Sequence, residues 1–154
     1  MATREDVYAK FGRTAEVAQL FETELGTLLL AREGEVRGWH LKANPDQAAE
    51  FYEKLNRKTL GQILANLRDC LDFDERVAEA FRIALKARNQ LNHGFFERYN
   101  FAIFDFAGRS AMIDEQEKMY SELVAAYEIA QPAATQLVAR VQAARAAGAL
   151  REKL

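Results

Sequence analysis

The sequence predicts an all-α fold, a compact bundle of about five to six helices. Only two prolines and eight glycines punctuate 154 residues, which is too few for many short strands joined by turns. Apolar residues recur at three- and four-residue steps, as on one face of a helix. Several of these stretches also begin with residues that cap helices. A chain of this length ordinarily forms one domain, so we expect residues 1–154 to be a single helical domain.

The first part of the chain predicts one long helix, a loop and a short helix. Residues 3–32 carry apolar side chains at helical spacing, with a threonine as the N-cap. Residues 34–43 are expected to form a loop. Asn44 and Gln47 then have the spacing of a capping box, with Pro45 at the first helical position, where proline is favoured.

Two further helices are predicted in the middle of the chain. A second capping box, Thr59-Leu-Gly-Gln62, predicts a helix over residues 59–71. Two aspartates, Asp72 and Asp74, begin a helix that we expect to run to about His93. Gly94 follows as a residue suited to a left-handed helix end.

The last part of the chain predicts an aromatic segment and two helices. Six of the twelve residues from Phe95 to Phe106 are aromatic, more than one loop buries alone, which favours dimerisation. Ser110 is expected to cap a helix that ends near Ala130, and Pro132 is expected to start a final helix rich in alanine.

Composition narrows the classes of function. Twenty-one Lys and Arg against 23 Asp and Glu give a net charge of −2, which excludes a uniformly basic nucleic-acid-binding surface. The single cysteine cannot form an internal disulfide, and no apolar stretch is long enough to span a membrane. We therefore expect a cytoplasmic protein without a membrane partner. The sequence has no glycine-rich phosphate loop, and its two histidines and one cysteine are far apart. We accordingly expect no metal site and no tightly held cofactor.

Arg88 is the residue that departs most from the helical pattern. It falls within the apolar stripe of its predicted helix, and burying an unpaired guanidinium costs several kcal/mol. Glu22 likewise falls within the apolar stripe of the first predicted helix. An ion pair between Glu22 and Arg88 would therefore explain a buried Arg88 by its contribution to the fold alone. The alternatives are that Arg88 reaches solvent in a cleft or faces a partner subunit.

His93 and Asn89 stand close to Arg88 in the sequence. The negative end of the helix dipole favours a protonated imidazole at His93. Asn89, four residues earlier, is expected to lie on the same face and to hold the ring by a hydrogen bond. A histidine with a tuned pKa beside a fixed guanidinium suits phosphodiester chemistry, because one group moves a proton while the other grips the phosphate.

At these residues the chain resembles the HEPN superfamily of helical bundles. Members carry an Arg followed by Asn, Asp or His, and then a His after four to six intervening residues. Arg88, Asn89 and His93 match those positions here. The resemblance implies a homodimer, and catalytic members are metal-independent endoribonucleases, often toxins or phage-defence proteins. It thus implies RNA cleavage through attack of a ribose 2′-hydroxyl, which leaves a 2′,3′-cyclic phosphate, and an antitoxin protein as a partner.

The geometry of an ideal helix leaves two arrangements of the site open. Arg88 and His93 would point about 140° apart. Either the helix distorts near Gly94 and one subunit supplies both groups, or Arg88 of one subunit meets His93 of the other.

Three interpretations follow from the sequence. In the first, the chain is an endoribonuclease with Arg88, Asn89 and His93 as catalytic residues. Nearby cations would then bind substrate, namely Lys86, Arg82 and Arg98. In the second, a catalytically silent bundle of the same kind binds a nucleotide, RNA or protein partner. In the third, the chain is a structural helical dimer in which Arg88 only satisfies Glu22.

Overall fold

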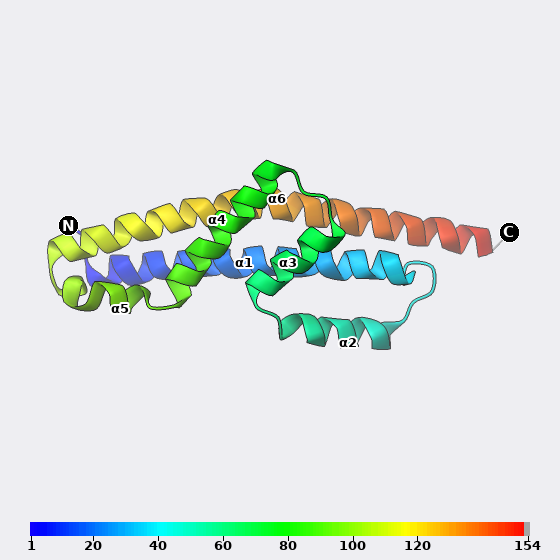
Figure 1. Ribbon diagram of the computed structural model, residues 1–154, viewed down its shortest axis with the longest axis horizontal. Coiled ribbons are helices and arrows are strands. Elements are labelled where there is room, and N and C mark those ends of the chain that lie inside the picture. Colours follow the sequence, from blue (N-terminus) through cyan, green and yellow to red (C-terminus); the bar gives the residue numbers. More distant parts are fainter. Residues whose placement is uncertain (153–154) are drawn as a thin grey trace. The chain divides into compact units, whose positions relative to one another are not determined.

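A computed structural model describes residues 1–152, with side chains described for residues 1–149. This part of the chain is helical and contains no strand, so the predicted all-α class is confirmed. Figure 1 shows the elements in chain order. They are α1 (Arg4–Arg37), α2 (Pro45–Asn56), α3 (Leu60–Cys70), α4 (Glu75–Asn92), α5 (Phe95–Tyr99), the 3-10 helix η1 (Asn100–Phe104) and α6 (Phe106–Glu152).

The chain divides into two compact units. Unit 1 contains Met1–Phe21 and Asp74–Glu128, and unit 2 contains Glu22–Phe73 and the chain from Ile129 onward. Each unit therefore takes one part of α1 and one part of α6. That residues 1–154 behave as a single domain stays a prediction.

Most of the predicted helix starts are confirmed. Thr59 and Gln62 form both arms of a capping box, at 3.2 and 2.9 Å. Asp74 Oδ1 accepts the backbone N–H of Val77 at 2.9 Å and caps α4. Asn44 accepts the backbone N–H of Gln47 at 3.1 Å. These caps are readable from sequence because donor and acceptor lie three residues apart.

The predicted end of the first helix was wrong by several residues. α1 continues to Arg37, into the first part of the predicted loop, and an ion pair between Glu33 and Arg37, one turn apart, stabilises this last turn. The helix ends at Gly38, which has a φ of +71°. The backbone N–H of Trp39 then bonds the carbonyl of Gly34 at 2.9 Å. Gly38, and not Gly34, is the left-handed stop.

The predicted division of the C-terminal part was also wrong. α6 runs without interruption through both Ser110 and Pro132. It begins at Phe106, where Asp105 Oδ1 accepts the N–H of Gly108 at 2.7 Å. Pro132 removes the hydrogen bond that the carbonyl of Glu128 would accept, a loss of about 3 kcal/mol in a helix interior. The surrounding alanines, which are strong helix formers, favour continuation on both sides.

Unit 1 has a core of aliphatic and aromatic side chains from its α-helices. In this core, 5.3 Å separates the ring centres of Phe21 and Phe81. Phe11 of α1 also contacts α5, with 5.1 Å between its ring centre and that of Phe96. The buried apolar residues are Val7, Ala18, Phe21, Phe81, Ala84, Ala87, Leu91, Phe95, Met112, Met119, Leu123 and Ala126.

Unit 2 has a core dominated by leucine. α2 lies against α1 where Leu55 Cδ2 is 3.5 Å from the position a Cβ would take at Gly26. Arg140 of α6 grips Glu35 of α1 with two hydrogen bonds, at 2.8 and 2.9 Å, which lowers the pKa of the Glu35 carboxyl. The buried apolar residues are Leu25, Leu28, Leu29, Leu55, Leu60, Ile63, Leu64, Leu67, Ala130, Ala134 and Leu137.

Gln116 is the exception in the core of unit 1. Its side chain is fully buried, and neither amide atom has a hydrogen-bond partner among the described residues. We expect Gln116→Leu to raise the free energy of unfolding by about 1–2 kcal/mol, because it removes a desolvated amide. Urea denaturation measures the change, and the exposed Gln136→Leu on the same helix should shift it by less than about 0.5 kcal/mol. A lower stability in Gln116→Leu would contradict the prediction.

Candidate functional site

Arg88 lies at the edge of the buried face of α4. That face consists of Phe81, Ala84, Ala87 and Leu91. Arg88 itself is half-buried, with its Nε out of contact with solvent. Its Nη1 donates to Asn89 Oδ1 at 3.2 Å. The position of Arg88 thus keeps part of the guanidinium within reach of solvent while the adjacent amide orients it.

Glu22, the expected ion-pair partner of Arg88, is half-buried in α1. It belongs to unit 2, whereas Arg88 belongs to unit 1. The ion pair between them stays a prediction.

His93 is the first residue beyond α4 and is exposed. Its backbone has left the helix, with φ −113° and ψ 90°, and its N–H donates to the carbonyl of Asn89 at 2.9 Å. Gly94 follows in the left-handed region at φ +83°. The angular separation of an ideal helix therefore does not apply to His93. Both arrangements predicted for the site, within one subunit or across two, stay predictions.

The amide of Asn89 is engaged differently from the sequence expectation. Within residues 1–149, it accepts a hydrogen bond from Arg88 and makes none with the ring of His93. Asn89 therefore acts on the guanidinium, and the imidazole is reached only through the backbone bond between the two residues.

Two of the three predicted substrate-binding cations contact carboxylates of the chain itself. Arg82 holds Glu79 with two hydrogen bonds, at 2.6 and 2.7 Å. Arg98 donates to Glu115 at 2.6 Å and to the carbonyl of Gln90 at 3.0 Å. These carboxylates offset the positive charge of two of the three predicted substrate-binding cations.

Lys86 lines a groove of about 330 Å³ in unit 1, between α4 and α6. Arg82 and Gln90 lie on the same wall, and the opposite wall carries Glu115, Lys118 and Glu122. The groove therefore carries charges of both signs and has no strong preference for phosphate.

Sequence reasoning missed the group around Tyr99 and Glu115. The Tyr99 hydroxyl donates to Glu115 Oε2 at 2.5 Å, and burial together with this carboxylate raises the pKa of Tyr99 to about 12. Glu115 thus ties both Tyr99 and Arg98 to α6. The contact joins residues 16 and 17 positions apart, so no helical spacing could have revealed it.

Metal-binding clusters and membrane-spanning helices are both absent from the described residues. No three His, Cys, Asp or Glu side chains gather there closely enough to hold a metal ion. None of the described helices has both the length and the apolar character needed to cross a membrane.

No protein-family model, curated protein or solved structure matches this chain.

Proposed function

We propose that this protein is a homodimeric, metal-independent endoribonuclease of the HEPN type that acts on cytoplasmic RNA. The observation that carries the proposal is the end of α4, where a half-buried guanidinium is oriented by an amide one turn before an exposed histidine. A guanidinium binds two phosphate oxygens in one plane. The imidazole of His93 is exposed at the C-terminus of α4 and is therefore accessible to a substrate. Histidine is the side chain most often used as a general acid or base.

The proposed reaction is an internal transfer within RNA. The 2′-hydroxyl of a ribose loses its proton and attacks the adjacent phosphorus, and the bond from phosphorus to the 5′-oxygen breaks. That oxygen takes up a proton, so the products are a 2′,3′-cyclic phosphate and a 5′-hydroxyl. Arg88 would hold the non-bridging oxygens, His93 would serve as general acid or base, and Asn89 would position Arg88.

The test of this function is cleavage of a labelled single-stranded RNA by the purified chain in excess EDTA. We expect cleavage to persist, because the proposed step uses only protein side chains. The products should end in a 2′,3′-cyclic phosphate, and a 2′-deoxyribose at the scissile position should block the reaction. A requirement for Mg²⁺, or products without the cyclic phosphate, would contradict the proposal.

Exposed aromatic rings of unit 1 support the homodimer. Phe101 is 72% exposed, Phe104 59% and Phe106 48%, and isolated chains rarely leave several large rings together in solvent. Phe101 and Phe104 lie with 6.1 Å between their ring centres. They form an apolar surface that a second copy of this chain would cover.

We expect light scattering at micromolar concentration to show a dimer, and the double substitution Phe101→Ser with Phe104→Ser to convert it to monomer. Tyr52→Ser, which removes a ring of similar exposure in unit 2, should leave the dimer intact. A wild-type protein that is monomeric at these concentrations would contradict the proposed dimer and any site that combines Arg88 of one subunit with His93 of the other.

The second candidate function is a silent binding module. The observation in its favour is that Arg82 and Arg98 contact Glu79 and Glu115, which leaves fewer cations for an RNA backbone. This candidate predicts no cleavage of the labelled RNA in the EDTA assay, and its partner would be a protein or a nucleotide.

A further inference from the structure

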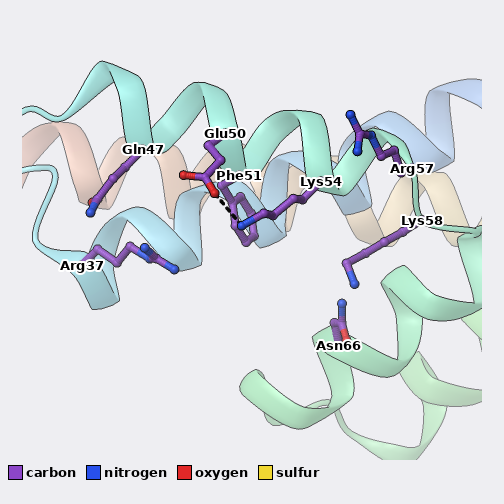
Figure 2. A pocket seen from close by; sticks show the side chains of 8 residues that line it. All are labelled: Arg37, Gln47, Glu50, Phe51, Lys54, Arg57, Lys58 and Asn66. Carbon is purple, nitrogen blue, oxygen red and sulfur yellow. Dashed lines mark hydrogen bonds and ion pairs between the residues drawn. The ribbon is translucent and has the colours of Figure 1, made fainter.

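A second pocket, in unit 2, has a different charge from the groove beside Lys86. It has a volume of about 540 Å³ and is lined by Arg37, Gln47, Glu50, Phe51, Lys54, Arg57, Lys58 and Asn66. Four of these side chains are cationic and one is a carboxylate. They come from the end of α1, from α2 and the turn after it, and from α3 (Figure 2).

The cations are spread along the pocket. Figure 2 shows Gln47 extending toward the side chain of Arg37 at one end, with the Arg37 guanidinium directed along the pocket, and Lys58 directed toward Asn66 at the other end. Lys54 lies between them on α2 and donates to Glu50 at 2.6 Å. This contact lowers the pKa of the Glu50 carboxyl, so Glu50 offsets one of the four positive charges. Glu33, which forms an ion pair with Arg37, offsets a second. Among the described residues, neither Lys58 nor Arg57 has a carboxylate within ion-pair distance.

The neutral residues of the pocket add donors and a ring. Gln47 Oε1 accepts the indole N–H of Trp39 at 3.0 Å, so its amide nitrogen is the group left to face the pocket. Asn66 supplies a second amide. Phe51 is half-buried and meets Trp39 edge-on, with 6.5 Å between the ring centres. Trp39 therefore contacts two of the lining side chains, Gln47 and Phe51, and restricts their orientation.

We propose that this pocket binds a small ligand that carries at least two phosphate groups, of the class of pyrophosphate and nucleoside diphosphates. Arg37 at one end and Lys58 at the other hold one negative group each, with Lys54 between them. Because Arg37 and Lys58 lie toward opposite ends of the pocket (Figure 2), a ligand with two negative groups would engage both of them. The amides of Gln47 and Asn66 donate hydrogen bonds, and the ring of Phe51 offers a surface to an organic group. The proposal does not depend on RNA cleavage, which involves residues of unit 1.

The emission of Trp39 provides the measurement, because this is the single tryptophan of the chain and it contacts Gln47 directly. Full-length protein is titrated with pyrophosphate, ADP and adenosine, with isothermal calorimetry as a second readout. We expect saturable binding of pyrophosphate and of ADP that weakens as salt is added. Tighter binding of ADP than of pyrophosphate would identify an organic diphosphate as the ligand, and equal binding would identify the phosphates alone. Either result supports the proposal that this pocket binds a ligand with two phosphate groups.

Charge variants localise the binding. Lys58→Glu and Arg37→Gln should each raise Kd by about tenfold or more, since each removes a charge-assisted contact. Lys42→Glu, an equally exposed lysine of unit 2 outside the pocket, should leave Kd unchanged, and melting curves confirm that all three variants fold. The proposal is overturned if neither diphosphate binds saturably, if adenosine binds as tightly as ADP, or if Lys42→Glu weakens binding as much as Lys58→Glu.

Discussion

Replacement of His93 by alanine should lower the rate of RNA cleavage by about 10²- to 10⁴-fold, the usual contribution of a positioned general acid or base. The fold should be unaffected, because the side chain is exposed and only its backbone N–H closes α4. Single-turnover cleavage of a labelled RNA measures the loss. His40→Gln, at the other histidine of the chain, is the matched control and should retain full activity.

Substitutions beside His93 separate the roles of its neighbours. Arg88→Lys should also abolish cleavage, because an ammonium group cannot bind two phosphate oxygens in one plane. Asn89→Ala should cause a smaller loss, since Asn89 touches Arg88 and not the reacting atoms in this proposal. Full activity in His93→Ala would refute the mechanism and favour the binding module.

Replacement of Gly108 by alanine should destabilise the protein by about 3 kcal/mol, the upper range for overfilling a packed site. A Cβ at Gly108 would lie 2.0 Å from the carbonyl oxygen of Ala102, which belongs to the backbone of η1. η1 cannot move away freely, because Arg109 donates to the carbonyls of Ile103 and Ala2. Chemical denaturation followed by circular dichroism measures the change.

Gly12→Ala is the opposite case and serves as the control. Gly12 lies on the exposed face of α1, and a Cβ added there would have open space within 4 Å. Alanine at this position should stabilise the helix by about 1 kcal/mol. If Gly108→Ala were as stable as the wild type, the close packing of η1 on α6 would be incorrect.

What the sequence predicts about this fold depends on the distance between interacting residues. The Thr59 and Gln62 cap was predictable because its partners are three residues apart. A capping box at Asn44 would also require the side chain of Gln47 to accept the backbone N–H of Asn44. Gln47 instead accepts the indole N–H of Trp39. Trp39 lies across a loop whose course the sequence does not specify. Pro132 was misread because proline favours a helix start without forbidding an interior position.

The candidate sites, too, were predictable only where their residues lie close together in the sequence. Arg88, Asn89 and His93 were found because they lie within six residues of one another. The neutralising contact between Arg98 and Glu115 was not, because it depends on how α6 packs against α5. Lys54, Arg57 and Lys58 follow one another closely in the sequence, and that clustering was the available signal. Only the fold adds Arg37 and Asn66 to them.

The way the two units share the chain has a consequence for synthesis on the ribosome. α1 leaves the exit tunnel before the other helices described here. Unit 1 is then incomplete until Glu128 has been added, and unit 2 is incomplete until the residues from Ile129 onward follow. Contacts such as Arg109 with Ala2 and Arg140 with Glu35 close loops of more than a hundred residues. Such long closures slow folding. Neither unit can therefore form completely on the nascent chain before its segment of α6 has been translated. Until then, the apolar side chains of the incomplete units stay exposed in a state that chaperones recognise.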